Sequence, residues 1–109
     1  MPRAEEAGNV AHIAIVEFRM DPARLEEAHA VVADLLEDTR SFPGFERLEW
    51  LVNRDDPAHW TLYETWASWE AEQAYRDFRA GEGAVPGLAE LLAARPTLVR
   101  YETRTSYEA

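Results

Sequence analysis

The sequence predicts an α+β fold of the ferredoxin-like, split-βαβ kind, in which a four-stranded antiparallel sheet carries two main helices. Segments rich in β-branched and aromatic residues alternate with segments of helical period, in the order β-α-β-β-α-(α)-β. An Asp-Pro turn between the two middle strand segments predicts that they form a hairpin. Right-handed crossovers then put the first and third strands in the middle of the sheet, with both main helices on one face.

The first half of the chain supplies a strand and a long helix. Residues 1–9 have no hydrophobic period, so we expect a loose arm before a single domain formed by residues 10–109. The segment 10–20 is rich in β-branched residues and predicts a strand. Asp21 before Pro22 is typical of an N-cap followed by proline at the first helical position, and the helical period continues to about residue 40.

The second half begins where Pro43 and Gly44 interrupt the chain with a turn. Ser68 is placed to cap the next helix, and a short third helix is expected to stop before Pro96. The predicted elements are strands 45–54 and 59–66, a helix over 69–79, a short helix over 88–94 and a strand over 97–107.

Composition limits the classes of function. A chain of 109 residues is long enough for one domain with one core. The net charge of -10 argues against nucleic acid and anionic membranes as partners. The absence of cysteine excludes disulfides, thiolate catalysis and cysteine-based zinc sites. No apolar run approaches the length of a membrane span and no signal peptide is visible, so we expect a soluble cytoplasmic protein.

The predicted strands carry apolar residues on both faces. In the first strand Ala14, Val16 and Phe18 point one way, while Ile13 and Ile15 point the other. Two helices cover only one face of such a sheet, and an antiparallel sheet with one wet face would alternate more cleanly. We therefore expect a homodimer in which the sheet of a second copy covers the other face.

Three segments carry a resemblance to a known family: "FPGF" after the first helix, "RDDPAHWTLYETW" across the hairpin, and the helix opening "ASWEAEQAY". They resemble the antibiotic biosynthesis monooxygenase family, whose members are small dimeric α+β barrel proteins. That family combines a Pro-Gly turn, a strand, an Asp-Pro turn and a strand ending in Tyr-Glu-x-Trp, followed by a helix. The resemblance extends over about residues 10–104, nearly the whole chain.

The resemblance implies a cofactor-independent monooxygenase. Family oxygenases act with dioxygen on phenolic or anthrone-like polyketide intermediates, and use no flavin, metal or heme. The implied site is a pocket between sheet and helices in each subunit of a homodimer, with Trp66 in its wall. Two positions depart from the family: Leu62 stands where several oxygenases have asparagine, and Tyr75 stands where many members have histidine. The histidine and asparagine of the heme-degrading branch are not evident.

The candidate catalytic residues are Trp66, Tyr75 and His29. The indole of Trp66 offers a flat apolar surface and one N–H donor to an aromatic substrate, and the Tyr75 hydroxyl can orient a substrate oxygen. We expect His29 on the buried side of the first helix, within reach of the same cavity. The candidate substrate-binding residues are Trp66, Trp50, Leu62, His12 and Phe78. Trp66, Tyr75 and His29 each have a structural alternative as core residues, Trp50 can fill the dimer core instead of a pocket wall, and we expect Trp60 and Trp69 to be structural.

The charged residues and the histidines say less about function than the aromatic residues do. Glu64 lies in an otherwise apolar strand, so we expect an inward carboxylate paired with Arg100 or Arg104. The three histidines have no ligand-like spacing, and no metal or other cofactor is expected.

Two function classes stay open: the oxygenase, and a non-oxidative dimer of the same fold, such as an isomerase, a cyclase-like protein or a small-molecule-binding protein. The departures at Leu62 and Tyr75 favour the second class, while the aromatic cluster fits both.

Overall fold

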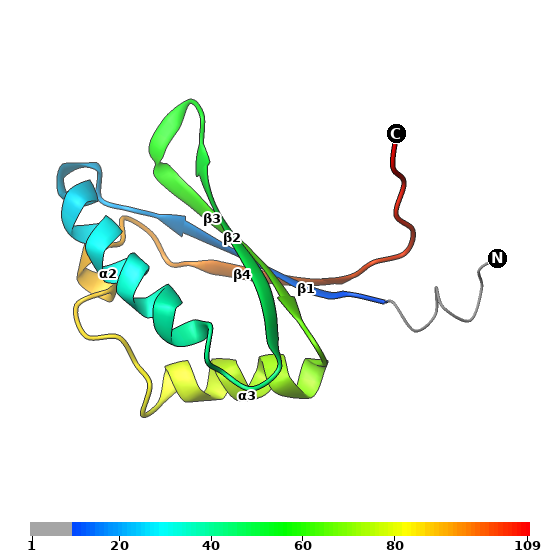
Figure 1. Cartoon of the computed structure of the whole chain (residues 1–109). Helices are drawn as coiled ribbons and strands as arrows, with labels where there is room; N and C mark the ends of the chain where they lie inside the picture. The colour runs from blue at the N-terminus through cyan, green and yellow to red at the C-terminus, as the bar shows by residue number, and fades with distance from the viewer. Residues whose placement is uncertain (1–9) are drawn as a thin grey trace.

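The computed structural model describes residues 10–109, so the arm predicted for residues 1–9 lies outside the described residues. In chain order the elements are β1 (His12–Arg19), the 3₁₀ turn η1 (Pro22–Arg24), α2 (Leu25–Thr39), β2 (Phe45–Asn53), β3 (Asp56–Trp66), α3 (Trp69–Ala80), the 3₁₀ turn η2 (Ala89–Leu91) and β4 (Thr97–Glu102). Figure 1 shows α2 and α3 together on one side of the twisted sheet, while the segment after β4 runs away from the body.

The sheet has the predicted topology. Its strand order is β2-β3-β1-β4 with antiparallel pairing throughout, which confirms that the first and third strands lie in the middle. The register sets Glu64 opposite both Leu48 and Ala14, and sets Ala14 opposite Arg100. Alternate residues of a strand share a face, so these four side chains form one row across the helix-covered face.

Both predicted caps accept a backbone hydrogen bond at the start of a helical segment. The Asp21 side chain accepts a hydrogen bond from the Ala23 N–H at 2.9 Å, but the first turn is 3₁₀ and the α-helix starts only at Leu25. Ser68 accepts from the Ala71 N–H at 3.1 Å and caps α3. The buried residues of α2 are Ala28, Val32, Leu35 and Thr39.

The inner face of α3 is polar. Its buried residues are Glu72 and Tyr75, whereas Ala74 is exposed. A carboxylate is tolerated here because two arginines pair with it. This polar inner face brings charge into the space between helix and sheet.

Three predicted boundaries are wrong. The expected third helix over 88–94 is only the 3₁₀ turn η2, whose Leu91 is buried against the main core. The last strand ends at Glu102 rather than at residue 107, because Glu102 is the last partner that β1 offers. The third strand begins at Asp56, since the hairpin turn is tighter than expected.

The second face of the sheet carries several apolar side chains among polar ones, and no helix of residues 10–109 covers it. Ile15 in β1 lies between Tyr63 of β3 and Val99 of β4, and Ile13 lies opposite Tyr101. Tyr63, Val99 and Tyr101 are 37%, 46% and 52% exposed, which is high for apolar side chains in a sheet. We call Tyr63, Val99 and Tyr101, together with Leu51, the open face.

Candidate functional site

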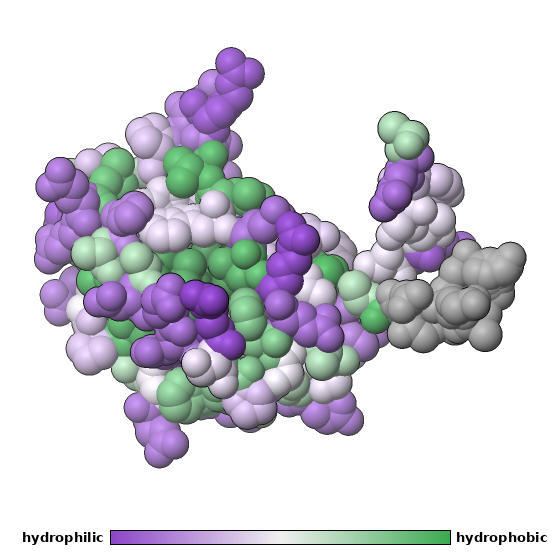
Figure 2. Space-filling model, in the orientation of Figure 1, coloured by the Kyte–Doolittle hydropathy of each residue, from purple (hydrophilic) through white to green (hydrophobic). Residues whose placement is uncertain are grey.

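A cavity of about 160 Å³ lies between the sheet and the helices, and we call it the inner cavity. Its residues come from β1, β3, both helices and the segment that follows α3: Val16, Phe18, Leu35, Leu62, Glu64, Tyr75, Arg76, Arg79, Val85 and Leu88. Figure 2 shows apolar surface between polar patches on this side of the molecule. A mainly apolar lining with a few charged groups is typical of sites that bind small molecules.

The buried acid of the inner cavity is Glu64, which is 2% exposed. Its Oε1 accepts hydrogen bonds from Arg76 Nη2 at 2.6 Å and from Trp66 Nε1 at 3.0 Å. Arg76 also donates through Nε to Glu72 Oε2 at 2.6 Å. Burial opposes the charge of Arg76, but the charge of Glu64 and the hydrogen bonds to both carboxylates outweigh it and raise the pKa of Arg76. The guanidinium therefore stays charged.

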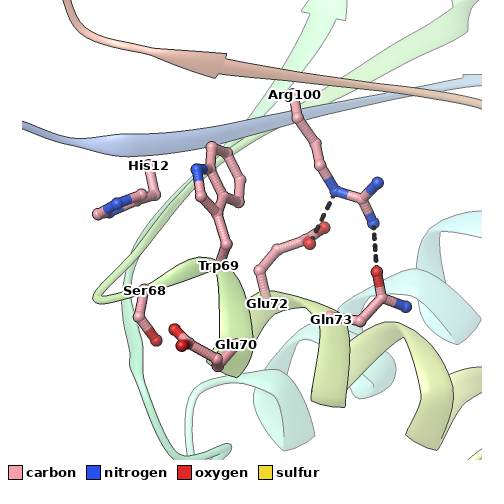
Figure 3. Close-up of a pocket in the computed structure, with 7 residues that line it drawn as sticks. All are labelled: His12, Ser68, Trp69, Glu70, Glu72, Gln73 and Arg100. Atoms are coloured by element: carbon pink, nitrogen blue, oxygen red, sulfur yellow. Dashed lines mark hydrogen bonds and ion pairs between the residues drawn. The ribbon is translucent and has the colours of Figure 1, made fainter.

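The ion pairs continue outward from Arg76 to the edge of the sheet. Glu72 is 1% exposed and accepts from Arg100 Nε at 2.8 Å, while Arg100 Nη2 donates to Gln73 at 3.3 Å. Figure 3 shows these contacts between α3 and β4 in a second, open hollow of about 560 Å³. The lining of this outer hollow is His12, Ser68, Trp69, Glu70, Glu72, Gln73 and Arg100. The row of charges Glu64, Arg76, Glu72, Arg100 thus connects the inner cavity to the outer hollow.

The prediction that Glu64 pairs with Arg100 or Arg104 is wrong, because its partner is Arg76. Glu64 and Arg100 share a row of the sheet, but β1 lies between their strands. Two strand spacings, about 9–10 Å, separate their backbones, and each side chain pairs with a residue of α3 instead of with the other. The small side chain of Ala14 lies between them in the sheet. Arg76 and Glu72 of α3 connect Glu64 to Arg100 through a series of ion pairs.

A second polar group joins α3 to the end of α2. Arg79 Nε donates to the Tyr75 hydroxyl oxygen at 2.9 Å, and that oxygen lies 2.8 Å from Thr39 Oγ1. Thr39 donates its own hydrogen to the Leu35 carbonyl at 3.0 Å. A hydroxyl has one hydrogen, so Tyr75 must be the donor to Thr39 and the acceptor from Arg79.

Three of the candidate residues lie together at the inner cavity. Leu62 and Tyr75 line it directly. Trp66 stands one layer behind: it is 1% exposed, and its ring lies against that of Tyr75 with a centroid separation of 5.0 Å. Its N–H is directed to Glu64, so Trp66 holds two lining residues in position.

His29 and Trp50 lie elsewhere. The expectation that His29 is buried is wrong, because it is exposed on α2. Successive helical residues are about 100° apart, and the inward stripe runs through Ala28 and Val32, which turns His29 away. Its ring packs on Trp50 at 4.8 Å, and Trp50 in turn contacts Trp60 at 5.0 Å. Neither His29 nor Trp50 lines the inner cavity.

His12 and Phe78 are also separated from the inner cavity. His12 meets Trp69 edge-on at 5.0 Å in the outer hollow (Figure 3). Phe78 packs on Phe42 at 5.4 Å and lines a third hollow beside the residues that follow α3. The candidate set is therefore spread over several places in the fold.

Sequence reasoning missed the charged residues of α3. Glu72 and Arg76, and likewise Tyr75 and Arg79, are four residues apart, a spacing that puts each pair on one helix face. Together with an inward Glu64, that spacing could have indicated a charged cluster. Thr39 could not be found in this way, because its partner is distant in the sequence.

Two further features concern metals and membranes. Among residues 10–109, no group of three or more histidine, aspartate or glutamate side chains is placed to hold a metal ion. Within the same described part of the chain, no helix is both long and apolar enough to span a membrane.

The fold defines a ferredoxin-like α+β protein with a cavity between sheet and helices. The family model of antibiotic biosynthesis monooxygenases matches residues 11–85, which is more than half of the chain. The chain belongs to the antibiotic biosynthesis monooxygenase family, which confirms the resemblance found in its sequence. No curated protein matches it.

Solved structures agree with this fold. A crystal structure of an antibiotic biosynthesis monooxygenase has a TM-score of 0.76 at 19% identity, covering 86% of this chain and 99% of that one. Rv0793 from Mycobacterium tuberculosis has a TM-score of 0.75 at 16% identity, covering 90% and 99%. A variant of SnoaB, a cofactor-independent oxygenase from Streptomyces nogalater, has a TM-score of 0.75 at 18% identity, covering 88% and 95%. At these identities the similarity establishes the fold.

Proposed function

We propose that the protein is a cofactor-independent monooxygenase that oxidises a small phenolic compound with dioxygen in the inner cavity. The observation that carries the proposal is the lining of that cavity, where an apolar floor faces Glu64, Arg76 and Arg79. Membership of the family and the similarity to a cofactor-independent oxygenase support the same reaction class.

The chemistry can proceed without a cofactor because the substrate supplies all the electrons. A phenol with a free para position loses two hydrogen atoms and gains one oxygen atom to become a quinone. The second atom of dioxygen leaves as water, so the four electrons that dioxygen accepts come from the phenol. The protein needs to hold the ring, favour the electron-rich ionised form and exclude water.

The size of the inner cavity favours a substrate with one ring. Its volume of about 160 Å³ is below the roughly 300–1,000 Å³ of common ligand pockets. Anthrone-like polyketide intermediates, which the family resemblance suggests, are therefore the less favoured substrates. In this proposal Leu62 and Tyr75 contact the ring, Trp66 supports Tyr75 from behind, and His29, His12, Trp50 and Phe78 take no part in the chemistry.

The proposal includes a homodimer formed through the open face. Apolar side chains of β2, β3 and β4 are exposed there, and burying them against a second copy would remove them from water. The inner cavity lies on the opposite side of the sheet, so each subunit would keep its own site.

An oxygen electrode tests the reaction. Purified protein is mixed with a panel of single-ring phenols and with one anthrone, against reactions without protein. We expect oxygen uptake and quinone absorbance in a one-to-one ratio with a single-ring phenol. Leu62→Phe, which reduces the space in the cavity, should abolish it, while the surface variant Arg40→Gln should not. Failure of every phenol to consume oxygen would contradict the proposal.

The second candidate function is non-oxidative: isomerisation, a cyclase-like role or binding of a small molecule. One observation favours it. Leu62, which lines the inner cavity, provides no hydrogen-bond donor where several family oxygenases have asparagine. Tight binding of a phenol without oxygen uptake would support this alternative.

A further inference from the structure

We infer that the inner cavity binds its ligand as an anion, and that Arg79 is the residue that stabilises the negative charge. The choice of a phenol as ligand rests on the proposed function. The proposed function requires an ionised phenol, and the inference adds the side chain that stabilises its negative charge.

Four of the charged side chains at and beside the cavity pair with one another. Glu64 and Glu72 are paired with Arg76 and Arg100, so these two acids and two bases neutralise one another. Arg79 stands outside this set. It lines the cavity, is partly buried, and forms no ion pair with an acid of residues 10–109. A partly buried charge without a counterion is costly, and an anionic ligand would supply the missing partner.

The hydrogen bonds of Arg79 all end on neutral oxygens. Besides the Tyr75 hydroxyl at 2.9 Å, it donates to the Gly83 carbonyl and the Leu35 carbonyl, both at 3.0 Å, and to Thr39 Oγ1 at 3.3 Å. The Leu35 carbonyl belongs to the last turns of α2, where the helix dipole offers a partial negative charge. These contacts fix the guanidinium in place but provide no full negative charge.

The surrounding acids do not neutralise Arg79 directly. Asp34, Asp38 and Glu82 share the third hollow with it and are exposed. Within residues 10–109, none of them forms an ion pair with Arg79. Solvent screening weakens the interaction of exposed charges that are not in direct contact.

Arg79 has a donor left for a ligand. A guanidinium carries five N–H groups, and Nη1 uses only one of its two, on Gly83. Tyr75 cannot provide the donor, because its single hydrogen goes to Thr39 and its oxygen accepts from Arg79. A phenolate oxygen beside Arg79 in the cavity would therefore be stabilised by the charge and the free N–H of Arg79, and Tyr75 would contribute the part of its ring that lines the cavity.

The test uses 4-nitrophenol, a single-ring phenol whose visible absorbance reports its ionisation directly. The absorbance is titrated with pH in the presence and absence of excess purified protein. We expect the bound phenol to ionise at least about one pH unit below the free phenol, which is a tenfold preference for the anion. Arg79→Gln should abolish this shift, Arg79→Lys should retain part of it, and the surface variant Arg40→Gln should retain all of it.

The controls separate a ligand-binding role from a structural one. The neutral methyl ether 4-nitroanisole should bind the unmodified protein and Arg79→Gln equally well, and thermal melts show whether each variant is folded. No binding of 4-nitrophenol, no shift in the unmodified protein, or the same shift in Arg79→Gln would overturn the inference. None of these readouts needs turnover. A shift without oxygen uptake would therefore leave the anion site standing and reject the oxygenase.

Discussion

Trp66 combines two contacts that explain why a tryptophan occupies this position. Its ring lies against Tyr75, Phe42 and Phe45, and its N–H donates to the buried carboxylate of Glu64. A phenylalanine would keep part of the aromatic contact and lose the donor. The functional interest of Trp66 is therefore indirect, since it sets the positions of two groups that line the inner cavity.

We predict that Trp66→Phe lowers the free energy of unfolding by about 1–3 kcal/mol, because it leaves unfilled volume and removes a donor from Glu64. A denaturant or thermal melt measures the loss. Trp69→Phe is the matched control: its N–H bonds Glu102 at an exposed site, so we expect a loss below about 1 kcal/mol. A Trp66→Phe protein of normal stability that no longer binds 4-nitrophenol would instead place the indole in contact with the ligand.

The sequence predicts the apolar part of the site better than its charged part. Strand parity puts Leu62 and Glu64 on the inner face, and helical period puts Tyr75 there too. His29 was misplaced because one helical residue changes direction by about 100°, so a small error in phase exchanges inside for outside. Arg79 was missed because its partners come from α2 and from the segment after α3, whose approach depends on tertiary packing.

Among the elements, the turn between α2 and β2 constrains the position of α3. Gly44 has φ of +85°, and a Cβ atom at this position would overlap the Cβ of Ala71 in α3. The Gly44 carbonyl also accepts from the Ala67 N–H at 2.8 Å, just before α3 begins. Glycine is needed here both for the backbone angle and for the close approach of the helix.

We predict that Gly44→Ala destabilises the protein by more than about 1 kcal/mol, since it combines backbone strain with a steric clash. Gly87→Ala is the matched control, because Gly87 has nearly the same φ, +84°, and nothing within 4 Å of its Cβ position. The difference between the two losses, measured by thermal melts, gives the packing contribution. Equal losses would mean that Ala71 yields easily and that the turn does not constrain α3.

The element boundaries show where sequence patterns lose information. The caps Asp21 and Ser68 mark helix starts through local hydrogen bonds, so they can be found from the sequence. The end of β4 at Glu102 depends on where β1 begins, and no pattern within residues 97–107 records that. Local contacts are therefore predicted well, and limits set by a distant partner are not.

At the scale of the whole molecule, the helices of residues 10–109 cover one face of the sheet and leave the other uncovered. Tyr63, Val99, Tyr101 and Leu51 are substantially exposed on the open face. Contiguous apolar surface of this kind marks an interaction site in soluble proteins, and a second copy offers a self-complementary partner.

We predict that light scattering gives about twice the chain mass of 12.4 kDa. Val99→Lys places a charge on the open face, opposite Ile15, and should shift the protein toward monomer at micromolar concentration. Ala30→Lys, on the exposed side of α2, adds the same charge elsewhere and should leave the dimer intact. A monomer in the unmodified protein would contradict the dimer and require another partner for this face.

The row Glu64, Arg76, Glu72, Arg100 also limits which substitutions evolution can accept at these four positions. Each internal member of the row serves two neighbours, so the loss of any one leaves an unpaired charge beside a buried one. Single substitutions along the row should therefore be selected against, whereas replacement of the whole set by apolar residues is tolerable. Among relatives, we expect these four positions on β3, α3 and β4 to be inherited or lost together.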